Sequence, residues 1–142
     1  MILLIGAWYN EAEYAFNFSY KVDLLIREKI INEIFTKYKL DSIENDWFLN
    51  IVIATNSQIS KLEVRGPEKR KRQKMIDYGL WIPYNDVMNA PNPLEKYIQY
   101  VFESLALVFN EYGVEKKDVI DLILVVNEVI LNESSYLDQD EE

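Results

Sequence analysis

The spacing of the apolar residues changes along this chain, and that change constrains its fold more than any other feature. Five short segments up to residue 83 have the apolar runs or the two-residue alternation that are typical of strands. These segments are Met1–Ile5, Tyr14–Tyr20, Trp47–Ala54, Lys61–Arg65 and Ile76–Ile82. Helical spacing occurs once among them and twice after residue 92. The sequence therefore predicts an α+β fold.

Three segments have the patterns of helices. From Val22 to Tyr38 the apolar residues fall on one helical face. The second helix is marked by Asn92 as a cap, Pro93 at the first helical position and an acid three residues after the cap, and Gly113 ends it. The third segment, Lys116–Leu131, is apolar around so much of its circumference that we expect it to be largely buried.

Two prolines are expected to end strands, because proline cannot donate a hydrogen bond to a sheet ladder. Pro67 follows the segment Lys61–Arg65, and Pro83 follows Ile76–Ile82. We expect strands and helices in the order ββαβββαα, in an antiparallel sheet whose last three strands form a meander and whose helices pack on one face. The length fits a single α+β domain over residues 1–133, followed by an acidic tail over residues 134–142 that composition predicts to be disordered.

The chain contains no His and no Cys, so the usual catalytic and metal-binding groups are absent. Nucleophilic catalysis needs a base beside a Ser, Thr or Cys, and four glycines supply neither a phosphate loop nor a dinucleotide fingerprint. No stretch has the pattern of a calcium loop. We therefore predict a protein that is not an enzyme and that has no cofactor and no metal. An enzyme that works through carboxylates alone stays open as an alternative.

Charge is divided unevenly along the chain. The net charge is −9, but the segment Arg65–Lys74 holds six basic residues and one acid, which leaves −14 on the rest. An acidic body favours a basic partner and disfavours nucleic acid. The lack of Cys and the shortness of the apolar run Met1–Ile5 predict a cytoplasmic protein without a membrane span.

Two short motifs resemble a known class of proteins. They are Leu62-Glu-Val-Arg-Gly-Pro67 and Asp77-Tyr-Gly-Leu-Trp-Ile-Pro-Tyr84, separated by the basic stretch and followed by an amphipathic helix that contains Tyr97. From Val22 to the end of the third predicted helix, the chain resembles bacterial immunity proteins of polymorphic or contact-dependent toxin systems. The resemblance implies an inhibitor, used in bacterial competition, that binds a cognate toxin domain, often a nuclease, and occludes it. The matching positions, which we expect to shape strand ends and core, are Gly66, Pro67, Tyr78, Trp81, Pro83 and Tyr84.

The resemblance assigns no contact residues, so candidate contacts come from charge. For a basic toxin we expect contacts from acidic residues near predicted turns, with one tryptophan as an anchor: Glu11, Glu13, Asp41, Glu44, Asp46 and Trp47. An alternative nucleic-acid site would use Lys69, Arg70, Lys71, Arg72 and Lys74, with Tyr78 and Trp81 close enough to stack on bases. A structural protein-interaction domain is the other alternative.

Overall fold

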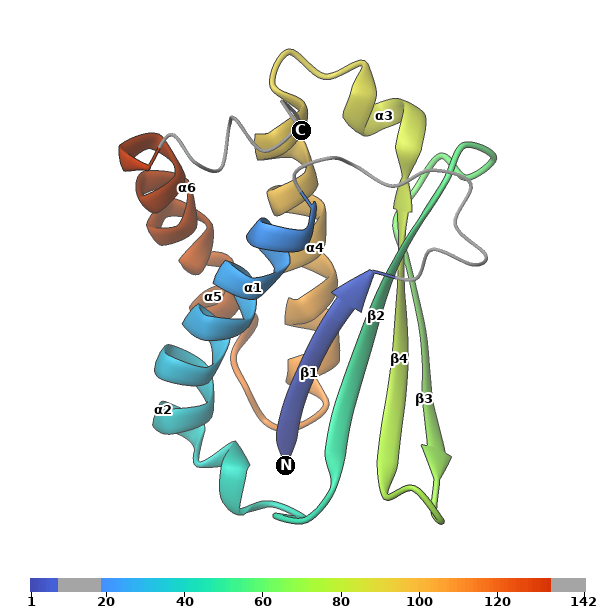
Figure 1. Cartoon of the computed structure of the whole chain (residues 1–142), viewed down its shortest axis with the longest axis vertical. Helices are drawn as coiled ribbons and strands as arrows, with labels where there is room; N and C mark the ends of the chain where they lie inside the picture. The colour runs from blue at the N-terminus through green and yellow to red at the C-terminus, as the bar shows by residue number, and fades with distance from the viewer. Residues whose placement is uncertain (8–18, 134–142) are drawn as a thin grey trace.

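The computed structural model describes residues 1–7 and 19–133 as one four-stranded sheet with helices on one side of it (Figure 1). The strands are β1 (Ile2–Ala7), β2 (Phe48–Asn56), β3 (Glu63–Arg70) and β4 (Met75–Pro83). The helical elements are α1 (Ser19–Lys29), the π-helical η1 (Ile30–Phe35), α2 (Thr36–Tyr38), the 3₁₀ turn η2 (Leu40–Ser42), α3 (Tyr84–Met88), α4 (Pro93–Asn110), α5 (Lys116–Ile120) and α6 (Leu122–Asn132). The predicted α+β class is confirmed.

The predicted antiparallel sheet is wrong, because most of the pairing is parallel. The strand order is β1-β2-β4-β3, with β1, β2 and β4 parallel and β3 antiparallel to β4. A helical connection returns the chain to the same end of the sheet and so joins β1 to β2 in parallel. The expected meander is also wrong, because β4 lies between β2 and β3. The charged β3 takes the edge, and the more apolar β4 takes the centre.

The first predicted helix is confirmed as a continuous helical segment from α1 through η1 to α2. It ends at Lys39, which has a left-handed φ of 55°. The predicted strand Tyr14–Tyr20 lies mostly outside the described residues, but its end is wrong, because α1 begins at Ser19. The tail over residues 134–142 also lies outside the described residues.

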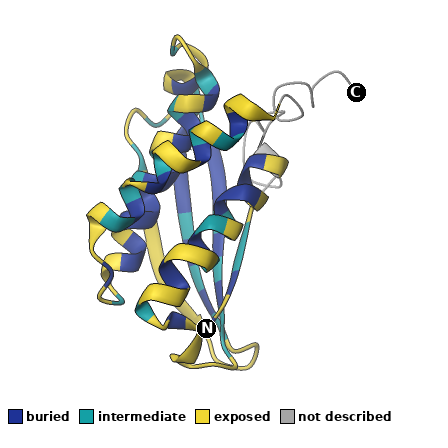
Figure 2. Cartoon of the chain, turned by 90° about the vertical axis from the view of Figure 1, so that its left-hand side faces the viewer, coloured by how far each residue is buried: buried dark blue, intermediate teal, exposed yellow. Residues whose placement is uncertain are grey.

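The core lies between the sheet and the helices, whose inner sides are buried (Figure 2). Alternate residues of β2 and β4 point into it, among them Leu49, Ile51, Ile76 and Leu80. The α4 helix begins as predicted, with the Asn92 side chain accepting a hydrogen bond from the backbone N–H of Glu95 at 3.2 Å. The described helices pack on this face of the sheet only, and none of them lies on the opposite face.

The last predicted helix is two helices, α5 and α6, which meet at Asp121. Val126 and Ile130 of α6 are buried, but Leu124 and Leu131 are 75% and 77% exposed. The expectation that this segment is largely buried is therefore wrong for its outer side, because α6 packs against α1 and α4 on one side only. No helix among the described residues is long and apolar enough to cross a membrane.

Candidate protein-binding surface

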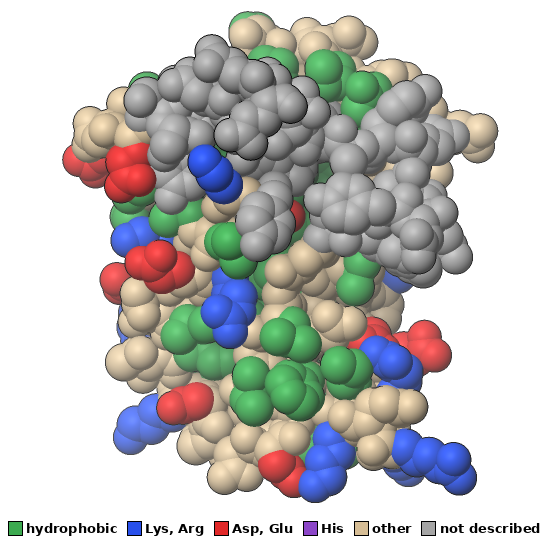
Figure 3. Space-filling model, in the orientation of Figure 1, with side chains coloured by type: hydrophobic (Ala, Val, Ile, Leu, Met, Phe, Trp, Pro, Cys, Tyr) green, Lys and Arg blue, Asp and Glu red, His purple; other side chains and the backbone are tan. Residues whose placement is uncertain are grey.

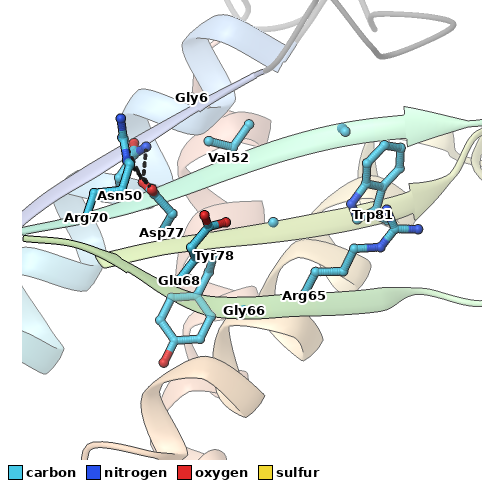
Figure 4. A pocket seen from close by; sticks show the side chains of 12 residues that line it. Gly6, Asn50, Val52, Arg65, Gly66, Glu68, Arg70, Asp77, Tyr78 and Trp81 are labelled. Atoms are coloured by element: carbon cyan, nitrogen blue, oxygen red, sulfur yellow. Dashed lines mark hydrogen bonds and ion pairs between the residues drawn. The ribbon is translucent and has the colours of Figure 1, made fainter. Parts of the chain in front are cut away.

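The face of the sheet opposite the helices carries a hollow of about 690 Å³ (Figure 4). Its floor is low because Gly6, Ala54 and Gly79 contribute small side chains or none. A Cβ atom added at Gly6 would meet no atom within 4 Å. Larger side chains from β2, β3 and β4 surround this floor, so the hollow is built into the sheet itself.

A β-bulge in β3 decides which of its side chains face the hollow. Glu63 and Arg65 lie on the open face, and the register then shifts by one residue before Glu68. Because side chains alternate along a strand, an unbroken strand would turn Lys69 toward this face. The bulge instead places Glu68 and Arg70 there. Two copies of a Glu-x-Arg sequence therefore line the same side of the sheet.

The bulge requires glycine at position 66. Gly66 has a φ of +112°, and a Cβ atom there would lie 2.5 Å from the carbonyl oxygen of Asp77. The next residue is Pro67, and the bond between them is cis. The prediction that the strand ends at these two residues is wrong, because β3 continues to Arg70 after the bulge. At a β-bulge the strand can continue past residues that would not fit into an uninterrupted ladder of backbone hydrogen bonds.

At one end of the hollow, Asp77 is held by two donors (Figure 4). The Arg70 guanidinium donates from Nε to Asp77 Oδ2 at 2.5 Å and from a terminal nitrogen to Oδ1 at 3.1 Å. The Asn50 amide donates to Oδ1 at 2.9 Å. Partial burial opposes ionisation, but these hydrogen bonds outweigh it and lower the pKa of Asp77 below its ordinary value. The carboxylate is thus fixed in its charged form.

At the other end of the hollow, Arg65 covers a tryptophan (Figure 4). Its guanidinium carbon lies 4.2 Å from the centre of the Trp81 ring, a cation–π geometry. A terminal nitrogen of Arg65 also donates to Glu63 Oε2 at 2.9 Å. Trp81 is only 9% exposed as a result. Glu68, between the two ends, has no hydrogen bond or ion pair with any described residue.

The predicted acidic and basic sites lie next to each other rather than on separate faces. Asp46, on the connection before β2, forms an ion pair with Lys74 on the β3–β4 turn. The Lys69 ammonium lies 5.9 Å from the centre of the half-buried Trp47 ring. Each predicted site therefore partly neutralises the other.

The remaining predicted contacts are dispersed. Asp41 and Glu44 are exposed on the connection that leads to β2, and Glu11 and Glu13 lie outside the described residues. Of the basic candidates, Arg70 faces the hollow, while Lys71 and Arg72 are exposed on the turn and form no ion pair with described residues. Acidic and basic side chains are intermixed on the face that Figure 3 shows.

The aromatic residues expected to stack on bases are not free to do so. Tyr78 is 3% exposed, on the helix side of β4, and its hydroxyl donates to Glu111 Oε2 at 2.5 Å. Burial and these partners raise the pKa of Tyr78, so the hydroxyl stays a donor. Trp81 is covered by Arg65. Neither of these two residues is therefore available to stack on a base, as the nucleic-acid alternative requires.

The sequence interpretation missed the residues at the centre of the hollow. Asn50 and Asp77 each interrupt an otherwise apolar strand, and both are partly exposed. A polar residue at such a position indicates a strand with one open face. Among the described residues there is no group of three or more side chains that could hold a metal ion.

No protein-family model, no curated protein and no solved structure matches this chain. The function of the chain is therefore inferred from the chemistry of the open face of the sheet.

Proposed function

We propose that this chain is a binding protein of the immunity type, which neutralises a cognate basic toxin domain by occluding it and holds that domain on the open face of the sheet. The observation that carries the proposal is the face of three parallel strands, β1, β2 and β4, that no described helix or strand covers. Parallel strands are normally covered on both faces, because helices pack on each side. A partner protein would supply the missing cover.

The charged groups of the hollow suit binding better than catalysis. Asp77 is locked between Arg70 and Asn50, and Arg65 is held by Glu63 and Trp81. Side chains fixed in this way lose little further freedom when a partner arrives, which favours affinity. A general acid or base needs a pKa near neutrality, whereas the pKa of Asp77 is lowered. This difference argues against Asp77 as a general acid or base.

Long-range charge supports a basic partner. Residues 93–133 hold eight acidic and three basic side chains, in addition to the acidic residues over 134–142. An excess of negative charge speeds the approach of a basic protein and disfavours a nucleic acid. The short-range contacts would then form on the open face, where Arg65 and Arg70 are already paired with carboxylates.

The test fills the hollow without disturbing the fold. Gly6→Arg places a long side chain where a Cβ meets no atom within 4 Å, and Gln99→Arg makes the same charge change on the exposed side of α4. Each protein is co-expressed with the basic protein encoded beside it, and co-purification and protection from growth arrest are measured. The wild type and Gln99→Arg should bind and protect, and Gly6→Arg should do neither. Failure of the wild type to bind, or normal binding by Gly6→Arg, would overturn the proposal.

A further inference from the structure

The hollow contains one negative charge that no described residue neutralises. Three carboxylates and two guanidinium groups line it or border it. Glu63 pairs with Arg65, and Asp77 pairs with Arg70. Glu68 is the carboxylate that remains, since it has no ion pair with any described residue.

The position of Glu68 makes this excess costly. In the sheet register Glu68 lies directly opposite Asp77, and like charges at facing positions of antiparallel strands destabilise the pair. Arg70 relieves part of the repulsion. Its pKa is raised mainly by the hydrogen bond and charge of Asp77, and only weakly by Glu68. A second cation beside Glu68 would remove the remaining repulsion.

The acceptors that remain open in the hollow also favour a cation. Both oxygens of Asp77 already accept hydrogen bonds. The Asn50 side chain uses its NH₂ group as a donor to Asp77, so its carbonyl oxygen is left as an acceptor. Both guanidinium groups are already paired with carboxylates, so an incoming anion would meet no unbalanced positive charge in the hollow. A group that only donates hydrogen bonds breaks neither pair.

We infer that the hollow receives a guanidinium or ammonium side chain of the partner protein, held by the Glu68 carboxylate with the Asn50 carbonyl oxygen as a second acceptor. This inference rests on the proposed use of the open face. The hollow, at about 690 Å³, falls within the size range of ligand-binding clefts, so it has room for a whole Arg or Lys side chain together with the backbone that carries it. A basic toxin domain presents such side chains on its surface.

The test uses small cations, so it does not depend on knowing the partner. Methylguanidinium chloride and methylammonium chloride are titrated into the isotope-labelled protein, with sodium acetate as the anion control. Nuclear magnetic resonance follows the Asn50 side-chain amide, the Trp81 indole N–H and the backbone amide of Gly79. The cations should cause saturable shifts at these groups, and acetate should not. Glu68→Gln should weaken the cation affinity about tenfold, as expected for the loss of a charged hydrogen-bond partner.

A matched variant controls for the change in net charge. Glu95→Gln removes one exposed carboxylate from the start of α4, in the helical layer, and should leave the cation affinity unchanged. Shifts that do not saturate, that spread over the acidic surface or that keep the wild-type affinity in Glu68→Gln would overturn the inference. If the cations fail to bind but Gly6→Arg still abolishes partner binding, only the inferred cation is wrong. If the cations bind and no partner does, only the proposed function is wrong.

Discussion

Replacing Asp23 with Asn should stabilise the protein at neutral and alkaline pH, with no gain in acid. Asp23 lies on α1 and is 3% exposed. The Tyr97 hydroxyl donates to its Oδ1 at 2.7 Å, whereas its Oδ2 is buried without a hydrogen-bond partner among the described residues. Burial raises the pKa of this carboxyl from 3.8 to about 7, and the hydrogen bond from Tyr97 opposes the rise only partly.

The sign and size of the effect follow from proton linkage. Between the ordinary pKa of 3.8 and the raised value of about 7, the folded protein keeps a proton that the unfolded chain has lost. The free energy of unfolding therefore falls as the pH rises through this window, by roughly 4 kcal/mol in all. Asn does not titrate and keeps the acceptor for Tyr97. In acid the two side chains are both neutral, and each buries an unpartnered donor group, the carboxyl O–H in Asp and the NH₂ in Asn, so Asn should give no advantage there.

The assay is urea unfolding, followed by tryptophan fluorescence, at a series of pH values from about 4.5 to about 8.5. The advantage of Asp23→Asn over the wild type should grow across this range toward roughly 4 kcal/mol. Asp121→Asn, on the exposed surface between α5 and α6, controls for the loss of one negative charge. A stability difference between Asp23→Asn and the wild type that does not change with pH would refute the reasoning.

Four other substitutions test local features of the fold by their urea midpoints. Gly66→Ala should cost roughly 2 kcal/mol or more, because its φ is +112° and the added Cβ would meet a backbone carbonyl of β4, whereas Gly6→Ala, in open space, should be neutral or slightly stabilising. Asn92→Ala should cost about 1 kcal/mol, because it removes the side-chain cap of α4. Lys74→Gln should leave the midpoint almost unchanged, because its ion pair with Asp46 is exposed on both sides. A large loss from Lys74→Gln, or none from Gly66→Ala, would contradict these accounts.

Helix positions were predictable because their signals are local. The cap at Asn92 and the following proline fix the start of α4 within a few residues of sequence. The regular apolar spacing from Val22 onward likewise identifies the first helix. These two patterns depend mainly on neighbours along the chain. Local patterns failed elsewhere, because the predicted strand Tyr14–Tyr20 ends in α1 and the single helix predicted over Lys116–Leu131 is two helices.

Strand pairing was not predictable, because it depends on contacts between distant residues. The alternation in β2, β3 and β4 identifies three strands but does not say that β4 lies between the other two. The site was missed for a related reason. Asn50 and Asp77 meet only because β2 and β4 are neighbours. Arg65 and Arg70 lie on the same face of the sheet because of the bulge in β3, and in the sequence the Gly-Pro pair at this bulge has the pattern of a strand end.

The two edges of the sheet restrict how any partner can attach. Along β1, the Arg27 side chain donates from Nε to the carbonyl oxygen of Leu3 at 2.8 Å. Along β3, the bulge and Pro67 interrupt the outer edge. A visiting strand would find an occupied acceptor on one edge and a broken row on the other, which disfavours extension of the sheet by backbone pairing. If the proposed use of the open face holds, recognition then falls to side chains, and a change of partner would require only substitutions on that face.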